Sequence, residues 1–184
     1  MTTPTAIADT ILPAELVEAA RKVVEQNLAI GRRVSVAESC TGGLVCAALT
    51  EIPGSSEVLG CGFVTYSNDA KLDLLRVSSD VLETFGAVSI AVAWSMAQGA
   101  LERSGADVAV AITGIAGPEG GSDKKPVGTV VFARAEKGAD PANIVADRKQ
   151  YGDIGRGGVR LQAALCALEL LLPPPPVEAP ADAP

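Results

Sequence analysis

The chain has 184 residues, with 22 acidic against 15 basic side chains, a net charge of −7 and no histidine. This length suits one domain with a sizeable core, and the acidic balance argues against nonspecific nucleic-acid binding, which needs clustered Lys and Arg. The lack of histidine excludes Ser-His-Asp and Cys-His catalysis and every histidine-based metal site.

The composition also indicates the class of protein and the cellular compartment in which it is expected. The sequence is 48% hydrophobic but only 3% aromatic, with 19 glycines, which suits a compact α/β protein. Its four cysteines have no C-x-x-C spacing, so free thiols in a reducing cytosol are expected. The N-terminus lacks the pattern of a secretory signal, and the longest apolar stretch, 161–172, is interrupted by Gln162 and Glu169. We therefore expect a cytoplasmic protein with no membrane partner.

In chain order, we expect a flexible N-terminal arm over residues 1–12, a folded domain over 13–172 and a disordered Pro-rich tail over 173–184. Apolar periodicity, capping residues and glycine stops predict helices and strands in alternation through the first half of the domain. The expected helices cover 13–28, 44–51, 70–75, 78–85, 89–104 and 155–172, and the expected strands cover 34–37, 58–66, 107–113, 127–136 and 144–150.

The interleaved elements, with a hairpin predicted through 137–141, indicate an α/β fold: a three-layer α/β/α sandwich on a mixed β-sheet. Polar loops follow three of the expected strands, at 38–43, 66–71 and 113–121. Ligands of open α/β sheets bind beyond the carboxyl ends of the strands. The fold therefore predicts that Ser39 meets Tyr66, Asn68, Lys71 and Thr113 at one edge of the sheet.

The first of these loops, Ala37-Glu38-Ser39-Cys40-Thr41-Gly42-Gly43, joins a strand to a helix through small residues. Such a turn exposes hydroxyl and backbone N–H groups that can hold an anion or present a serine nucleophile. The same residues also serve simply to cap a helix. Cys40 is a rival nucleophile, ranked below Ser39 because no histidine stabilises its thiolate.

Without histidine, the base for a serine must come from another group. Lys71 can act as a base only where burial or neighbouring positive charge lowers its pKa; its ordinary role in the first turn of a helix is a solvated surface cation. Arg156 is the best internal candidate for gripping a phosphate or carboxylate. Lys124 and Lys125, in the long Gly/Pro loop, are its competitors.

Six short sequence segments, in the same order along the chain, resemble those of a known protein family. They are Ala37–Gly43, Pro53–Ser56, Val64–Asn68 with Lys71, Gly86–Ser89, Thr113–Pro118 with Gly120-Gly121, and Lys125–Thr129. Together they closely resemble the C-terminal domain of the CinA (competence/damage-inducible) family, the nicotinamide-nucleotide amidohydrolases, over roughly residues 14–172.

The resemblance implies hydrolysis of nicotinamide mononucleotide to nicotinate mononucleotide and ammonia, in pyridine nucleotide recycling. The lack of histidine and of a metal-binding cluster in the sequence supports a reaction without a metal, and we expect no cofactor. It implies Ser39 as nucleophile, Lys71 as base and Tyr66 as an aid to proton transfer. The implied substrate-binding residues are Cys40, Thr41, Gly42, Gly43, Asn68, Thr113, Gly114 and Arg156, with backbone N–H groups of 40–43 holding the oxyanion. The chain departs from the family at Gly152-Asp153-Ile154-Gly155-Arg156, where Gly-Asp-Arg is the common form.

Two alternatives stay open at this point. Ser39 could bind phosphate while a lysine-activated water attacks the amide. The chain could also be a catalytically weak nucleotide-binding or regulatory module of the same fold. The expected partners are a small nucleotide and a second copy of the chain in a homo-oligomer, a dimer, with no nucleic acid.

Overall fold

The computed structural model describes residues 10–140 and 142–174, which form an α/β domain on one five-stranded sheet. The strands are β1 (Val34–Glu38), β2 (Leu59–Val64), β3 (Val108–Gly114), β4 (Thr129–Glu136) and β5 (Val145–Gln150). Their order is β2-β1-β3-β4-β5; β1 pairs parallel with β2 and β3, and β4 pairs antiparallel with β3 and β5. The predicted mixed sheet and its late hairpin are confirmed.

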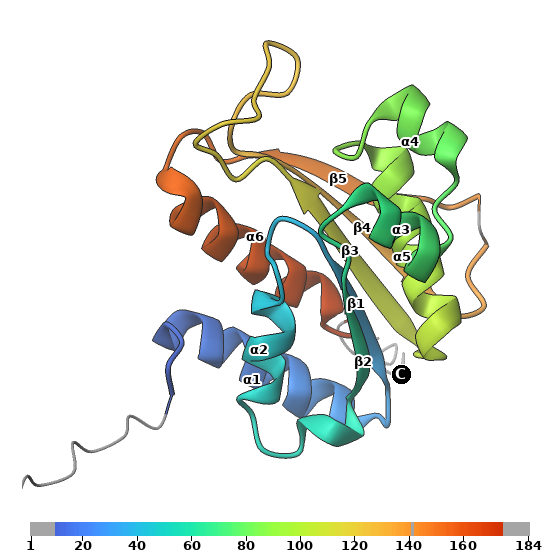
Figure 1. The fold of residues 1–184 in the computed structure, drawn as a ribbon. Coiled ribbons are helices and arrows are strands. Elements are labelled where there is room, and N and C mark those ends of the chain that lie inside the picture. Colours follow the sequence, from blue (N-terminus) through green and yellow to red (C-terminus); the bar gives the residue numbers. More distant parts are fainter. Residues whose placement is uncertain (1–9, 141, 175–184) are drawn as a thin grey trace, which may run out of the picture.

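Helices cover both faces of this sheet (Figure 1). One face carries α1 (Ala14–Ala29), α2 (Leu44–Thr50) and α6 (Gly155–Leu171). The other carries α3 (Asn68–Leu75), α4 (Ser79–Phe85) and α5 (Ile90–Ser104), and a short 3₁₀ helix, η1 (Ser55–Glu57), precedes β2. The three-layer α/β/α sandwich is therefore confirmed.

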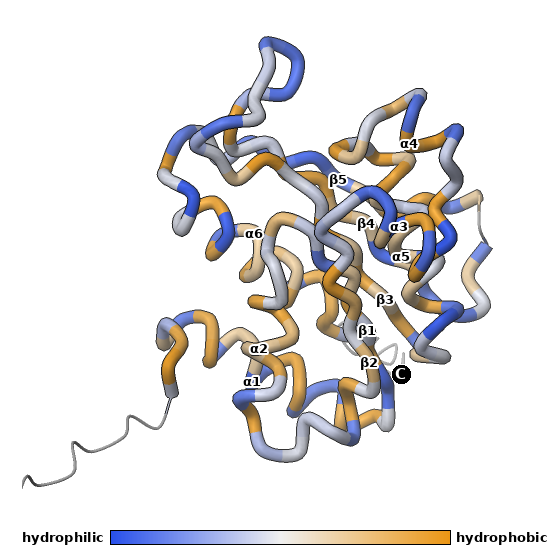
Figure 2. The backbone as a smooth tube through the Cα atoms, in the orientation of Figure 1, coloured by the Kyte–Doolittle hydropathy of each residue, from blue (hydrophilic) through white to orange (hydrophobic). Residues whose placement is uncertain are grey.

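Strand β3 contributes side chains to the hydrophobic cores on both faces of the sheet. Successive side chains of a strand point to opposite faces. Val108, Val110 and Ile112 lie in the core against α1 and α6, whereas Ala109 and Ala111 lie in the core against α5. Small alanines let α5 approach the sheet closely. Hydrophobic residues gather where the helices meet the strands, and hydrophilic residues gather at the tip of the loop between β3 and β4 (Figure 2).

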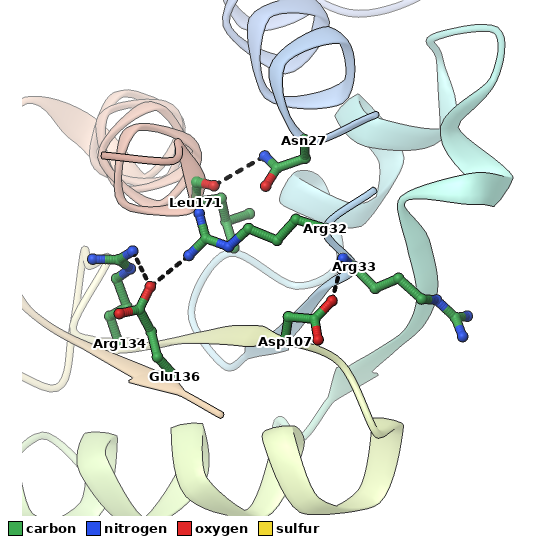
Figure 3. A network of polar contacts seen from close by, with 7 residues as sticks. All are labelled: Asn27, Arg32, Arg33, Asp107, Arg134, Glu136 and Leu171. Carbon is green, nitrogen blue, oxygen red and sulfur yellow. Dashed lines mark hydrogen bonds and ion pairs between the residues drawn. The ribbon is translucent and has the colours of Figure 1, made fainter. Parts of the chain in front are cut away.

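A polar network ties the layers together at the amino-terminal ends of β1 and β3 (Figure 3). The Asn27 amide donates to the Leu171 carbonyl at 3.1 Å, which joins α1 to the end of α6. Arg32 pairs with Glu136 at 2.6 Å, and Arg134 pairs with the same carboxylate oxygen. This network lies at the edge of the sheet opposite the polar loops and serves the fold.

The element boundaries differ from the predictions by a few residues, for local reasons. Helix α3 begins at Asn68 rather than at 70, because the Ser67 hydroxyl accepts from the Ala70 N–H and caps it. Strand β2 covers less than the predicted 58–66, since η1 precedes it and the chain leaves the sheet at Thr65. Ser78 holds the N-cap position of α4, but its side chain makes no capping hydrogen bond.

The predicted arm and tail fall mostly on residues 1–9 and 175–184, which lie outside the described residues. Within the described part of the chain, no helix has the length and apolarity to cross a membrane.

Candidate active site

The loops after β1, β2 and β3 meet at the carboxyl edge of the sheet, as parallel neighbours predict. They enclose a pocket of about 280 Å³. The predicted site residues that line it are Ser39, Cys40, Tyr66, Asn68, Lys71, Thr113, Gly114 and Arg156. Thr41, Gly42 and Gly43 are not among the lining residues.

The centre of the pocket is a contact between Lys71 and Ser39. The Nζ atom of Lys71 lies 3.2 Å from the Ser39 Oγ atom, within hydrogen-bond distance. Ser39 comes directly after β1, and Lys71 lies in α3, whose start is fixed by the Ser67 cap. The sequence-based prediction that these two residues meet agrees with this geometry.

Lys71 is buried, with 1% of its surface exposed. Its Nζ atom also donates to the carbonyl oxygens of Thr65, at 2.8 Å, and Ser67, at 3.3 Å. Burial lowers the pKa of Lys71 below its ordinary value, and the neighbouring Cys40 raises it to a smaller extent. A buried lysine with a lowered pKa is suited to accept a proton.

The three contacts of Nζ match the three N–H donors of an ammonium, and they are also compatible with a neutral amine. A neutral amine has two N–H groups and one lone pair. The two carbonyls can take the two N–H groups, and the lone pair is then left to accept the O–H proton of Ser39. The arrangement therefore has the parts of a nucleophile and its base.

Glu38, which the sequence analysis did not select, shapes the turn that carries the serine. Its carboxylate is fully buried and accepts hydrogen bonds from the backbone N–H groups of Gly43, Val45 and Cys46, at 2.9, 3.2 and 2.9 Å. The free backbone N–H groups at the start of α2 thereby find their hydrogen-bond acceptor in a side chain of β1. An acidic residue next to the candidate serine was the signal that could have found it.

The turn also requires its two glycines. Gly42 and Gly43 have φ angles of 61° and 91°, which are left-handed values that other residues adopt with strain. The Gly42 N–H donates to the Ser39 carbonyl at 3.1 Å, and the Gly43 N–H is held by Glu38. Of the four N–H groups predicted to hold an oxyanion, these two are committed to the turn itself, and those of Cys40 and Thr41 are left.

Arg160 of α6 supports the same turn from outside. Its Nη2 atom donates to the Thr41 carbonyl oxygen at 2.8 Å. Arg156 lies one helical turn earlier, so both arginines reach the carboxyl edge of the sheet. Arg160 is a second residue, after Glu38, that the sequence analysis did not select.

Arg156 joins two of the three loops. Its Nη1 atom donates to the Gly117 carbonyl oxygen at 2.9 Å, and its Nη2 atom donates to the Tyr66 hydroxyl at 2.8 Å. Arg156 therefore lines the pocket even though the preceding residues, Gly152–Gly155, depart from the common Gly-Asp-Arg form of the family. Lys125 instead donates to the Phe85 carbonyl at 2.9 Å, and neither it nor Lys124 is among the lining residues.

The remaining predicted residues contribute in different ways. The Thr113 hydroxyl donates to the Ala87 carbonyl at 2.9 Å, so it anchors the start of α5 beside the pocket. Gly114 allows β4 to approach, since a Cβ there would lie 2.8 Å from Val130. Asn68 lines the pocket at the first turn of α3.

Cys40 lines the pocket but is a poor nucleophile. It is buried, and burial raises the pKa of its thiol to about 12. The thiolate, which is the reactive form, is therefore scarce near neutral pH. Among the described residues, no three acidic or cysteine side chains are grouped so that they could hold a metal ion.

Comparisons with known proteins show the family to which the chain is similar. The profile of the CinA C-terminal domain family matches residues 17–173. The nicotinamide-nucleotide amidohydrolase PncC of Enterobacter agglomerans is 54% identical over 139 residues, which cover 76% of this chain and 82% of that protein. A CinA-like protein of Mycobacterium avium is 58% identical over 146 residues, covering 79% of this chain.

A solved structure extends the likeness to the fold. The competence/damage inducible protein CihA of Agrobacterium tumefaciens superposes with a TM-score of 0.84 at 51% identity, covering 88% of this chain and 96% of that one. The chain spans only 33% of the Mycobacterium avium relative and 34% of a Symbiobacterium thermophilum relative.

Proposed function

The chain belongs to the CinA C-terminal domain family, and from this membership we propose that it hydrolyses nicotinamide mononucleotide to nicotinate mononucleotide and ammonia. The observation that carries the proposal is the Lys71–Ser39 contact in a pocket lined by an arginine. A primary carboxamide needs an activated nucleophile, a site for the oxyanion and a proton for the departing ammonia. The reaction would recycle pyridine nucleotide.

In this proposal neutral Lys71 takes the Ser39 proton as Oγ attacks the amide carbon. Burial lowers the pKa of Lys71 and so favours the neutral form that can act as base. The ammonium formed in this step is stabilised by the carbonyl oxygens of Thr65 and Ser67. The resulting tetrahedral oxyanion is assigned to the backbone N–H groups of Cys40 and Thr41, because those of Gly42 and Gly43 are committed to the turn.

The charged Lys71 then returns its proton to the leaving nitrogen, directly or through the Tyr66 hydroxyl, and ammonia departs. Water next attacks the acyl-enzyme, with Lys71 again as base, and releases nicotinate mononucleotide. Atoms balance without a cofactor: one amide C–N bond breaks, and one water supplies the new carboxylate oxygen.

The phosphate of the substrate is assigned to Arg156. Its guanidinium is oriented by Gly117 and Tyr66, so its remaining N–H donors have a fixed direction. Lys125 is held by the Phe85 carbonyl, which favours Arg156 over the loop lysines.

The test is ammonia release from nicotinamide mononucleotide by the wild type, Ser39→Ala and Lys71→Arg, with the exposed Lys22→Arg as the matched control. We expect activity in the wild type and the control and its loss in both site variants, because arginine stays charged and cannot act as base. A wild type that binds the nucleotide without releasing ammonia would overturn the proposal in favour of a binding module. Trapping with hydroxylamine tests the acyl-enzyme, since direct attack by water leaves nothing to trap.

A further inference from the structure

One carboxylate, that of Glu119, lines the pocket beside the cationic groups. Among the lining side chains, Lys71 and Arg156 carry basic groups and Glu119 carries the carboxylate. Glu119 is exposed to solvent and lies on the loop between β3 and β4. Its carboxylate forms no ion pair within the described part of the chain.

The loop that carries Glu119 is fixed to the site by Arg156. The guanidinium holds the Gly117 carbonyl, two residues before Glu119, at 2.9 Å. Farther along, the Lys125 ammonium fastens the loop to the end of α4 through the Phe85 carbonyl. The carboxylate therefore sits on an anchored segment, with its charge unneutralised, at the mouth of the pocket.

The charges of the pocket form a pattern. Among the described residues, Lys71 and Arg156 are the basic side chains that line the pocket, and Glu119 is its one acidic side chain. A pyridine nucleotide with an oxidised ring has the complementary pattern: a phosphate anion at one end and a quaternary pyridinium cation in the ring that bears the carboxamide. Matching of opposite charges orients a dipolar ligand and rejects one that lacks a charge.

We infer that Glu119 is a specificity-determining residue that recognises the positive charge of the pyridinium ring. This inference rests on the proposed function, because it concerns how the same site selects its nucleotide. Glu119 does not touch the reacting bond; it favours substrates with a cationic ring over the same nucleotide with a neutral ring. The phosphate is repelled from Glu119 and attracted by Arg156, which sets the direction in which the substrate enters.

The experiment compares two ligands that share carboxamide, ribose and phosphate: nicotinamide mononucleotide, with a cationic ring, and its reduced 1,4-dihydro form, with a neutral ring. Dissociation constants are measured by calorimetry in the Ser39→Ala protein, so that no ligand is consumed, with and without Glu119→Gln. Asp123→Asn, which removes the same charge from the same loop outside the pocket, is the matched control.

We expect Glu119→Gln to weaken binding of the cationic ligand about fivefold, the size of a partly exposed charge pair, and to leave the neutral ligand unchanged. Asp123→Asn should alter neither. Equal weakening of both ligands would overturn the inference, since it would show a contact to the shared ribose; so would unchanged binding of the cationic ligand. Failure of the proposed function is separate, because it shows as a wild type that releases no ammonia.

Discussion

The Nζ atom of Lys71 lies 3.2 Å from the Oγ atom of Ser39, although the two residues are 32 positions apart in the chain. Lys71 is 1% exposed, so the lysine side chain of this contact is buried. Burial disfavours the ammonium and so lowers the pKa of the lysine. Lys71 can act as a base only in its neutral form, so its pKa determines how the activity depends on pH.

We predict that kcat/KM for nicotinamide mononucleotide rises with pH along a limb whose midpoint lies below 10.5, the ordinary value for lysine. The rise follows deprotonation of Lys71 in the free enzyme. Lys71→Met should lower kcat by about 10²–10⁴-fold, the usual contribution of a general base, and remove the limb. Steady-state ammonia release over a pH series measures both effects. A limb that persists in Lys71→Met would assign it to another group.

The same shift predicts a pH-dependent stability. Because the folded-state pKa of Lys71 is lowered, the unfolded chain binds more protons between that pKa and 10.5, and the free energy of unfolding gains a contribution that rises with pH in this window. The contribution is complete above 10.5 and lost below the folded pKa. Urea unfolding of the wild type and Lys71→Met at each pH isolates it, since other groups titrate alike in both. Parallel curves would show that burial does not perturb this lysine.

Glu38→Gln tests whether the buried carboxylate holds the serine turn. A glutamine keeps the shape but replaces one acceptor oxygen by an NH₂ donor, so it cannot satisfy the N–H groups of Gly43, Val45 and Cys46 together. We expect a loss of about 1–3 kcal/mol in the free energy of unfolding, the cost of an unsatisfied buried group, and a fall in kcat.

The matched control for that variant is Glu57→Gln, the same change on an exposed residue. It should alter stability by less than about 0.5 kcal/mol and leave kcat unchanged. Equal effects of the two substitutions would show that the Glu38 carboxylate does not hold the serine turn.

Much of the fold could be predicted because its signals are local. Val34–Glu38 and Val108–Gly114 are buried strands whose apolar runs are visible in the sequence, and Ser89 marks the start of α5. Parallel pairing of three strands then places their following loops at one edge. For this reason the meeting of Ser39 with Lys71 followed from the fold prediction.

Other site residues could not be predicted, because their roles depend on contacts between distant segments. Glu38 and Gly43 are near in sequence, but only the structure shows the carboxylate turning inward to accept the N–H groups of α2. Arg160 meets Thr41 across 119 positions, which no local pattern encodes. The prediction of an oxyanion site near residues 40–43 could not tell which N–H groups the turn itself uses, such as that of Gly43.

Arg156→Ala is predicted to discriminate between substrates with and without a phosphate. Loss of a charge-assisted contact should raise KM for nicotinamide mononucleotide about tenfold and leave KM for nicotinamide riboside nearly unchanged. Arg21→Ala, on the exposed face of α1, is the control and should change neither. Equal increases for the two substrates would mean that Arg156 acts by holding the Gly117 loop rather than by binding phosphate.

Two glycine substitutions within helices should have opposite effects on stability. At Gly99 of α5 a Cβ would overlap the carbonyl of Leu75, the last residue of α3, which also carries Lys71. Gly99→Ala should therefore lower the free energy of unfolding by about 1–3 kcal/mol and reduce activity, because α3 must shift. At Gly157 of α6 nothing lies within 4 Å of a Cβ, so Gly157→Ala should stabilise by about 0.5–1 kcal/mol through the lower entropy of the unfolded chain. Urea unfolding of the two variants measures the difference, and a neutral Gly99→Ala would show that α5 and α3 pack less closely than the structure has them.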